Sequence, residues 1–233
     1  MGIFDKKFTR TTGEIRFRPT LSSTEGVVTF AKILEDKFPH WRLQSENNVT
    51  LFDDKKKRLI QIRHNGIFFL NQGDESNEVS IDFLKTIYDE LIKTTNISEF
   101  IHLGARRRCV YESRFNIKDL TDLTFKKFYG NLASLKLISG ETINDTSFIL
   151  DATKDGFQTH VQIGPSQSEQ ADSFFEGQFP EERLEKTKAY LLLDVDVFLR
   201  KDFQKDTNIE ELRKVEKLNL EIVNSYLDFI SEK

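Results

Sequence analysis

Apolar residues in the first 96 positions recur at two spacings, which predict helices and strands. Helical spacing begins after the capping residues Ser22 and Ser23 and ends at Pro39. A second helical stripe spans residues 79–94. Short runs rich in β-branched and aromatic residues predict strands before and between these helices. The predicted strands cover residues 14–19, 41–45, 49–53, 58–63 and 67–70.

The second half of the chain repeats this order of elements. A long strand at 99–115 precedes a helix at 120–131, and a final helix covers about 208–231. Asn65-Gly66 in the first half and Asp155-Gly156 in the second are favoured two-residue hairpin turns. The remaining strands are predicted at 134–139, 147–152, 158–163 and 191–200, with a polar insertion at 164–188.

These patterns predict an α+β fold made of two tandem units that share one mixed sheet. Each unit contains a strand, a helix, several antiparallel strands and a second helix. The first unit covers residues 1–96. The second covers residues 97–233 and carries the polar insertion and a long terminal helix. The alternative is one irregular α+β domain whose two halves are alike by coincidence.

Composition excludes several kinds of partner and binding site. The chain has 233 residues and a net charge of −4, so no global positive field attracts nucleic acid or a membrane surface. Its 21 phenylalanines indicate a thick core, or a core with an apolar pocket. The single cysteine, Cys109, excludes an internal disulfide and a multi-cysteine metal site. We therefore expect a cytoplasmic protein, since a reducing compartment suits this cysteine usage.

Two aspartates interrupt the apolar strand at 191–200. Asp194 and Asp196 are two residues apart, so both carboxylates point to one face of the strand, where burial is costly unless they are paired. Arg106 and Arg108 have the same spacing in another predicted strand. We expect a structural ion pair or polar site between these arginines and aspartates. Divalent metal binding and an exposed binding face remain alternatives.

No catalytic constellation is evident, and we expect neither enzymatic activity nor a cofactor. The four histidines lack metal-ligand spacing, so no metal site is predicted. His102 is in phase with Arg106, which leaves a polar catalytic cavity with Asp194 as an alternative. Cys109 is in phase with Arg107, whose charge would lower the thiol pKa, although a buried inert thiol is the main expectation.

Two segments are candidates for partner binding. Phe174, Phe175 and Phe179 stand among polar residues of the 164–188 insertion, and aromatic residues in long loops often anchor a protein partner. The alternative is that they attach the insertion to its own domain. Nucleic acid is a less favoured partner because the chain is acidic overall; its best contacts would be Arg106, Arg107 and Arg108.

Several short motifs resemble a sporadically distributed, uncharacterised bacterial protein family of about this length. They are the stretch at 58–71, the strand LGARRRCV at 103–110 with Gly104 and Arg106, the late LDVDVF strand at 193–198, and the long C-terminal helix. The family's proline-rich opening is poorly matched. The resemblance implies no known activity, and it implies occurrence near mobile elements and antiviral defence genes.

We expect a non-enzymatic interaction module that acts as an adaptor, sensor or immunity-type component of a bacterial defence system. The absence of catalytic motifs and the phenylalanine-rich insertion favour this hypothesis. The alternative is a protein that binds a small apolar ligand between the sheet and the C-terminal helix, where the many phenylalanines would line a pocket. An enclosed cavity would favour the alternative, whereas a solid core with an exposed apolar patch would favour the interaction module.

Overall fold

A computed structural model describes residues 3–45, 48–72, 81–95, 97, 99–134, 142–174, 184–201, 203–204 and 208–232. It confirms a mixed α+β protein. The helices are α1 (Leu21–Leu34), α2 (Ile81–Thr95), α3 (Ile117–Tyr129), α4 (Ser168–Phe174) and α5 (Asn208–Ser231), with 3-10 turns at Glu35–Lys37 and Gly130–Ser134. The strands are β1 (Phe4–Phe17), β2 (His40–Ser45), β3 (Asn48–Asp53), β4 (Arg58–Arg63), β5 (Gly66–Gln72), β6 (Glu99–Ser113), β7 (Phe148–Lys154), β8 (Phe157–Gln167), β9 (Ala189–Leu199) and β10 (Phe203–Gln204).

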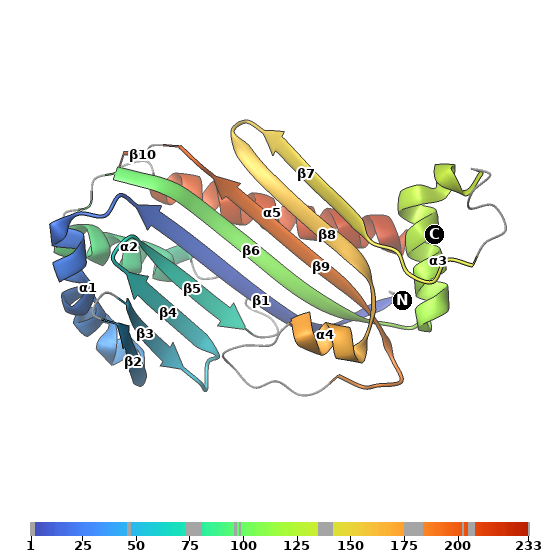
Figure 1. The fold of residues 1–233 in the computed structure, drawn as a ribbon, viewed down its shortest axis with the longest axis horizontal. Coiled ribbons are helices and arrows are strands. Elements are labelled where there is room, and N and C mark those ends of the chain that lie inside the picture. The colour runs from blue at the N-terminus through green and yellow to red at the C-terminus, as the bar shows by residue number, and fades with distance from the viewer. Residues whose placement is uncertain are drawn as a thin grey trace.

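The described strands form one sheet in the order β2-β3-β4-β5-β1-β6-β9-β8-β7, and β10 adds to one end of β6. The sheet is antiparallel and not mixed as expected, because each described strand pair runs in opposite directions. The long strands β1 and β6 pair with each other at the centre of the sheet. Helix α5 packs on β6 and β9, α1 packs on β3 and β4, and α3 packs on β8 and β9. Figure 1 shows α5 running behind the sheet in that view, while the opposite face of the central strands is turned toward the viewer.

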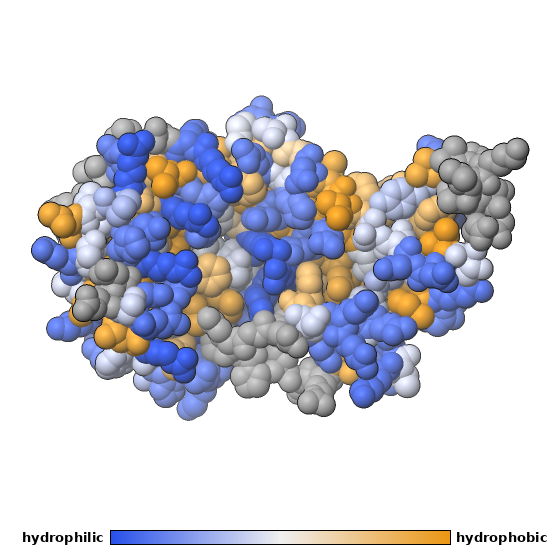
Figure 2. Space-filling model, in the orientation of Figure 1, coloured by the Kyte–Doolittle hydropathy of each residue, from blue (hydrophilic) through white to orange (hydrophobic). Residues whose placement is uncertain are grey.

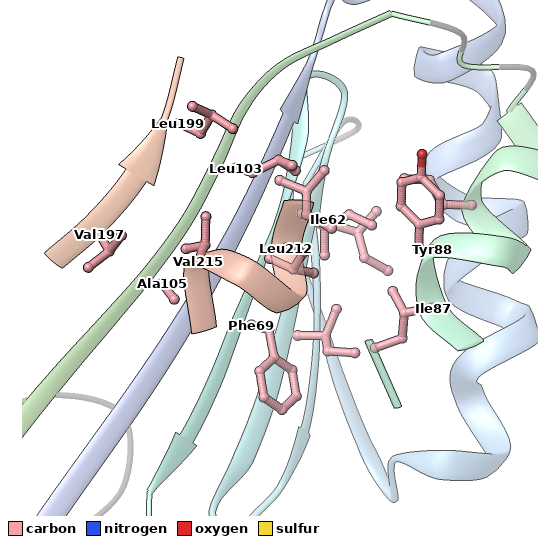
Figure 3. Close-up of a cluster of buried hydrophobic side chains, with 14 of the residues drawn as sticks. Ile62, Phe69, Ile87, Tyr88, Leu103, Ala105, Val197, Leu199, Leu212 and Val215 are labelled. Atoms are coloured by element: carbon pink, nitrogen blue, oxygen red, sulfur yellow. The ribbon is translucent and has the colours of Figure 1, made fainter. Parts of the chain in front are cut away.

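The apolar core lies between the sheet and these helices. Because strand side chains alternate between faces, every second residue of β6 and β9 enters the core, including Leu103, Ala105 and Val197. Leu212 and Val215 of α5 meet them from the helix side, as Figure 3 shows. The buried phenylalanines therefore fill a packed core.

Local sequence signals account for several boundaries. Helix α1 begins after Thr20, whose hydroxyl accepts a hydrogen bond from Ser23 N, while Ser23 Oγ accepts one from Thr20 N. This reciprocal capping box places the cap two residues before the predicted one. Asp155 and Gly156 both have positive φ angles, 53° and 84°, as their hairpin turn requires. The β4–β5 turn instead centres on His64 and Asn65, and Gly66 already belongs to β5.

Three segments differ from the sequence-based expectations. Strand β1 begins at Phe4 and not near residue 14, because Thr9, Arg10 and Thr11 are buried between the long neighbours β5 and β6 despite being polar. The insertion is shorter than 164–188, because β8 continues to Gln167 by pairing with β9 and is followed by α4. The strand expected at 134–139 falls almost entirely outside the described residues.

Buried polar contacts join α5 to the sheet. Asn219 Nδ2 donates to the backbone oxygens of Ala105 (2.9 Å) and Val195 (2.8 Å), which lie on β6 and β9. Arg107 Nη2 donates to Glu216 Oε1 at 2.6 Å, and both side chains are almost fully buried. The helix therefore contacts the sheet through two fixed polar anchors as well as through its apolar stripe.

Candidate functional site

Four neighbouring strands, β5, β1, β6 and β9, form a polar hollow of about 390 Å³ on the sheet face opposite α5. Figure 2 shows hydrophilic side chains gathered over the middle of this face. We call this region the sheet-face hollow. Five arginines line it: Arg10, Arg16, Arg106, Arg108 and Arg200.

The strand register arranges the hollow in rows. Residues that alternate along each strand share this face, and antiparallel pairing sets them side by side. Across β1, β6 and β9 the rows are Arg10, Arg108 and Asp194; then Thr12, Arg106 and Asp196; then Glu14, Gly104 and Phe198. A last β1–β6 row pairs Arg16 with His102. The hollow thus has arginines at both ends, and Arg106, carboxylates and an aromatic ring between them.

The expected ion pairs between β6 and β9 are present and converge on Asp194. Arg106 donates to it through Nε (2.8 Å) and Nη2 (2.5 Å), and Arg108 Nε donates at 3.1 Å. The carboxylate side chain is 3% exposed, whereas that of Arg106 is 40% exposed. Two arginines therefore compensate the buried charge of Asp194 and are held in place by it.

Asp196 is different from Asp194. Its side chain is half-buried and makes no hydrogen bond or ion pair with any residue that the structure describes. Burial raises its pKa, and the nearby positive charge of Arg106 only partly opposes this effect. Asp196 is therefore a carboxyl group whose hydrogen-bonding capacity is available to a ligand in the hollow.

Glu14, Arg16 and His102 form a second polar group at the other end. Arg16 donates through Nε (2.7 Å) and Nη2 (2.9 Å) to the two carboxylate oxygens of Glu14. His102 Nε2 lies 3.5 Å from Glu14 Oε2, and burial lowers the histidine pKa. The imidazole is thus favoured in its neutral form, and no nucleophile of the described chain contacts this group.

Aromatic faces complete the hollow. The Arg200 guanidinium lies over the Phe198 ring at 4.7 Å from its centroid, and His102 lies beside the same ring. Gly104 leaves room for the His102 ring between Glu14 and Phe198. A Cβ atom at Gly104 would lie 2.9 Å from His102 Nε2, so the ring occupies the space that any other residue would need.

Helix α4 borders the Arg108 end. Arg108 lies over the Phe174 ring, 5.2 Å from its centroid, and its Nη1 is 3.5 Å from the Phe174 backbone oxygen. Phe174 is half-buried against a small cluster that contains Val110 and Tyr190. Phe175 and Phe179, the other two residues expected to bind a partner, lie outside the described residues. The insertion therefore begins next to the hollow.

Arg107 was a candidate nucleic-acid contact together with Arg106 and Arg108, and its burial removes it from that set. Arg107 is only 1% exposed and points to the opposite side of the sheet, where it pairs with Glu216 of α5. Alternation along β6 separates it from Arg106 and Arg108. Only two members of the arginine run therefore belong to the hollow.

Cys109 follows Arg107 into the buried face and is 1% exposed, which fits an inert thiol. His40 contacts Asp54, and His160 contacts Asp151, although His160 is also opposite Asp196 in the β8–β9 ladder. Within the described part of the chain, no three His, Cys, Asp or Glu side chains are grouped to hold a metal ion. Asp194 and Asp196 therefore lack a third ligand among these residues.

Sequence analysis missed most of the hollow. Arg10, Glu14 and Arg16 of β1 were not identified, nor were Phe68, Phe198 and Arg200. One signal was available: from Arg10 to Arg16 every second residue is polar or charged, which is typical of a strand with one solvated face. Phe68 and Arg200 carried no such signal, because only the sheet order brings them to this site.

No protein-family model matches the chain, and no curated protein is detectably similar to it. None of the helices in the described ranges is long and apolar enough to cross a membrane.

Proposed function

We propose that the protein is a non-enzymatic interaction module that binds an anionic partner in the sheet-face hollow. One observation carries this proposal: on the sheet face opposite α5, several arginines retain N–H donors that no described residue accepts. Arg106 and Arg16 each hold a carboxylate with two nitrogens, and their Nη1 atoms make no hydrogen bond to any described residue. The Arg200 guanidinium lies over the Phe198 ring and makes no hydrogen bond to a residue that the structure describes.

The charge balance supports an anionic partner. Five arginines surround the hollow, against the three carboxylates of Glu14, Asp194 and Asp196, in a chain whose net charge is −4. The positive charge is therefore local, and a cleft lined by one sign of charge attracts the opposite sign. Asp194 and Glu14 orient guanidinium groups that would otherwise lose side-chain entropy on binding.

We further propose the tandem organisation of residues 1–96 and 97–233. Strand β5 returns to pair with β1, and β9 returns to pair with β6, so each central strand leads through a helix and further strands back to its own side. Under this proposal the hollow spans the seam between the two units. A site at a seam draws charged residues from both units, as Arg16 and Arg106 illustrate.

An exposed apolar patch favours an interaction module over an enclosed ligand pocket. Val28 of α1 and Trp41 and Leu43 of β2 are 43%, 60% and 53% exposed and line a groove of about 230 Å³. In contrast, Leu212, Val215 and Val223 of α5 are buried against the sheet. Side chains thus fill the interface between the sheet and the C-terminal helix. A protein that binds a small apolar ligand there would need a cavity at this place.

Binding of inorganic polyphosphate, followed by isothermal titration calorimetry at low and high salt, tests this proposal. The wild type is expected to bind, with affinity falling as salt rises. Replacing Arg16 and Arg200 together by Gln should weaken binding at least tenfold, since both guanidinium groups lie at one end of the hollow. A double variant on the opposite side of the sheet, Arg213→Gln with Lys217→Gln, is the matched control and should bind like the wild type. Equal losses in both variants would refute the site, and no binding by the wild type would refute the proposal.

A protein partner docked through the insertion is a second candidate, favoured by the contact of Phe174 with Arg108 beside the hollow. Membership of a bacterial defence system rests on the family resemblance alone. The test replaces Phe175 and Phe179 by Ser while Phe174, which packs on the domain, is kept. Loss of a co-purifying host protein with an unchanged melting temperature would support docking. A large fall in melting temperature would identify both rings as core residues.

A further inference from the structure

We infer that the anionic partner of the sheet-face hollow is single-stranded nucleic acid, with phosphates at the two arginine ends and bases over the middle. This inference rests on the proposed function and adds the class of partner. It is carried by the order of side chains along the rows: Arg108 at one end, then Arg106 beside Asp196, then Glu14 and aromatic rings, and then Arg16 and Arg200 at the other end.

The first step is the distance between the cationic ends. Arg108 lies at one end, and Arg16 and Arg200 lie at the other. Arg10, opposite Arg108, is only 6% exposed and donates to Gln72, so Arg108 supplies the accessible charge of this end. Six residues of β1 separate Arg10 from Arg16, which corresponds to about 20 Å along a strand. A free nucleotide carries its phosphates at one end only, whereas a strand supplies phosphates on both sides of each base. The spacing therefore favours a strand over a mononucleotide.

The second step is the aromatic surface. Phe198 of β9 and Phe68 of β5 are both half-buried and face the hollow from opposite sides. Gly104 lies between them on the floor without a side chain. Bases of single strands stack on aromatic rings and on arginine guanidinium planes, and the ring of Phe198 already carries Arg200 in that arrangement. An acidic peptide or a simple anion would leave these faces unused.

The third step concerns the acids in the middle of the hollow. Carboxylates repel phosphate but accept hydrogen bonds from the amino and imino groups of bases. Asp196 has no hydrogen-bond partner among the described residues, and Glu14 lies one row further along. The acids therefore favour bases over the middle rows, and the Arg106 guanidinium in the row of Asp196 offers these bases a plane for stacking. In a duplex these base edges and faces are already occupied, so paired nucleic acid does not fit this arrangement.

Fluorescence polarisation with a labelled 12-nucleotide DNA of mixed sequence, its RNA equivalent and the corresponding DNA duplex tests the inference. Either single strand is expected to bind more tightly than the duplex. The logarithm of the binding constant should fall with the logarithm of salt concentration by about 0.7 for each phosphate neutralised. The full chain is used, and each variant is first checked for an unchanged melting temperature.

Two variants separate charge from stacking. Arg200→Gln should weaken binding and reduce the salt slope by about 0.7. Phe198→Leu should weaken single-strand binding roughly fivefold or more, with the salt slope and polyphosphate affinity unchanged, because only stacking is lost. The control pair Arg213→Gln and Lys217→Gln should leave single-strand binding as in the wild type.

The outcomes distinguish the two proposals. Tight polyphosphate binding with no single-strand binding, or single-strand binding that Phe198→Leu does not weaken, would overturn the nucleic-acid inference and leave the proposed function standing. AMP that competes with the oligonucleotide at equal nucleotide concentration would overturn the strand in favour of a free nucleotide. Absence of binding to polyphosphate and to all three nucleic acids would overturn both the proposed function and the nucleic-acid inference.

Discussion

Arg106 forms its bidentate ion pair with Asp194, although Asp196 is the residue directly opposite it in the β6–β9 ladder. The diagonal choice leaves Asp194 between two arginines, since Arg108 also donates to it. Diagonal neighbours in an antiparallel pair lie within reach of long side chains. The more buried carboxylate is therefore compensated twice, and Asp196 remains open to the hollow.

Removing Arg106 should destabilise the protein moderately. Arg106→Met leaves Asp194 with Arg108 alone, so we expect a loss of roughly 1–3 kcal/mol in the free energy of unfolding. The half-exposed position of Arg106 and the remaining partner keep the loss below that of a fully orphaned charge. Urea unfolding measures it, and Arg42→Met on the exposed strand β2 is the control. A midpoint that stays at the wild-type value would show that Arg108 compensates Asp194 fully.

Breaking the buried ion pair of Arg107 and Glu216 should destabilise the protein more than replacing Arg106 does. Arg107→Met leaves the Glu216 carboxylate buried beside α5, and we expect a loss of about 3–5 kcal/mol. Combining Arg107→Met with Glu216→Leu should recover most of this loss, because an apolar pair of similar volume replaces both charges. Chemical denaturation of the two variants checks the prediction. A double variant that is less stable than the single one would contradict the proposed cause.

Asn219 should fix α5 to the sheet. Asn219→Ala removes the donor to two buried backbone oxygens, those of Ala105 and Val195, and we expect a loss of roughly 2 kcal/mol. Asn224→Ala on the exposed side of the same helix is the matched control and should change stability little. Thermal unfolding compares the two, and equal effects would mean that helix propensity, not the buried contact, decides the outcome.

Asp196 should make stability depend on pH in the opposite direction from an ordinary ion-paired acid. Burial raises its pKa above 3.8 in the folded protein; Asp194 and Glu14 raise it further, and Arg106 and His160 only partly oppose the increase. Between the unfolded and the raised folded pKa, the folded state binds more protons, so its stability falls as pH rises through this window. Asp196→Asn should therefore be more stable than the wild type at neutral pH.

The advantage of Asp196→Asn should disappear below about pH 4, where the carboxyl is protonated in both states. Unfolding midpoints from pH 3 to pH 8 measure this, and Asp228→Asn on the exposed surface of α5 is the control. A variant that gains stability equally at all pH values would rule out the titration of Asp196 as the cause.

The elements with one dominant periodicity were predictable. The apolar stripe of α5 and its cap at Asn208 indicated a helix at 208–231, and the structure has the same bounds. In contrast, β1 was predicted to begin ten residues too late, at residue 14 and not at Phe4. Polar residues occupy both of its faces around Thr9 and Thr11, so alternation of apolar and polar residues gave no signal there.

The sequence also indicated which residues of a single strand share one face of the sheet. The two-residue spacing of Arg106 and Arg108, and of Asp194 and Asp196, put each pair on one face, and this indicated contact between β6 and β9. The sequence did not indicate which aspartate Arg106 would bind, because that choice depends on the register of the two strands and on the burial of each carboxylate.

By itself, then, the sequence determined the element types, the mixed α+β class and the in-phase charged residues, because these depend on the local periods of helix and strand. Only the tertiary structure decided that β5, β1, β6 and β9 are neighbours, which assembles Arg10, Arg16 and Arg200 around Asp196. The tertiary structure also pairs Arg107 with Glu216, which is more than a hundred residues away in the sequence. Such contacts follow from strand order and from which sheet face the helices cover, and neither is encoded in any short stretch of residues.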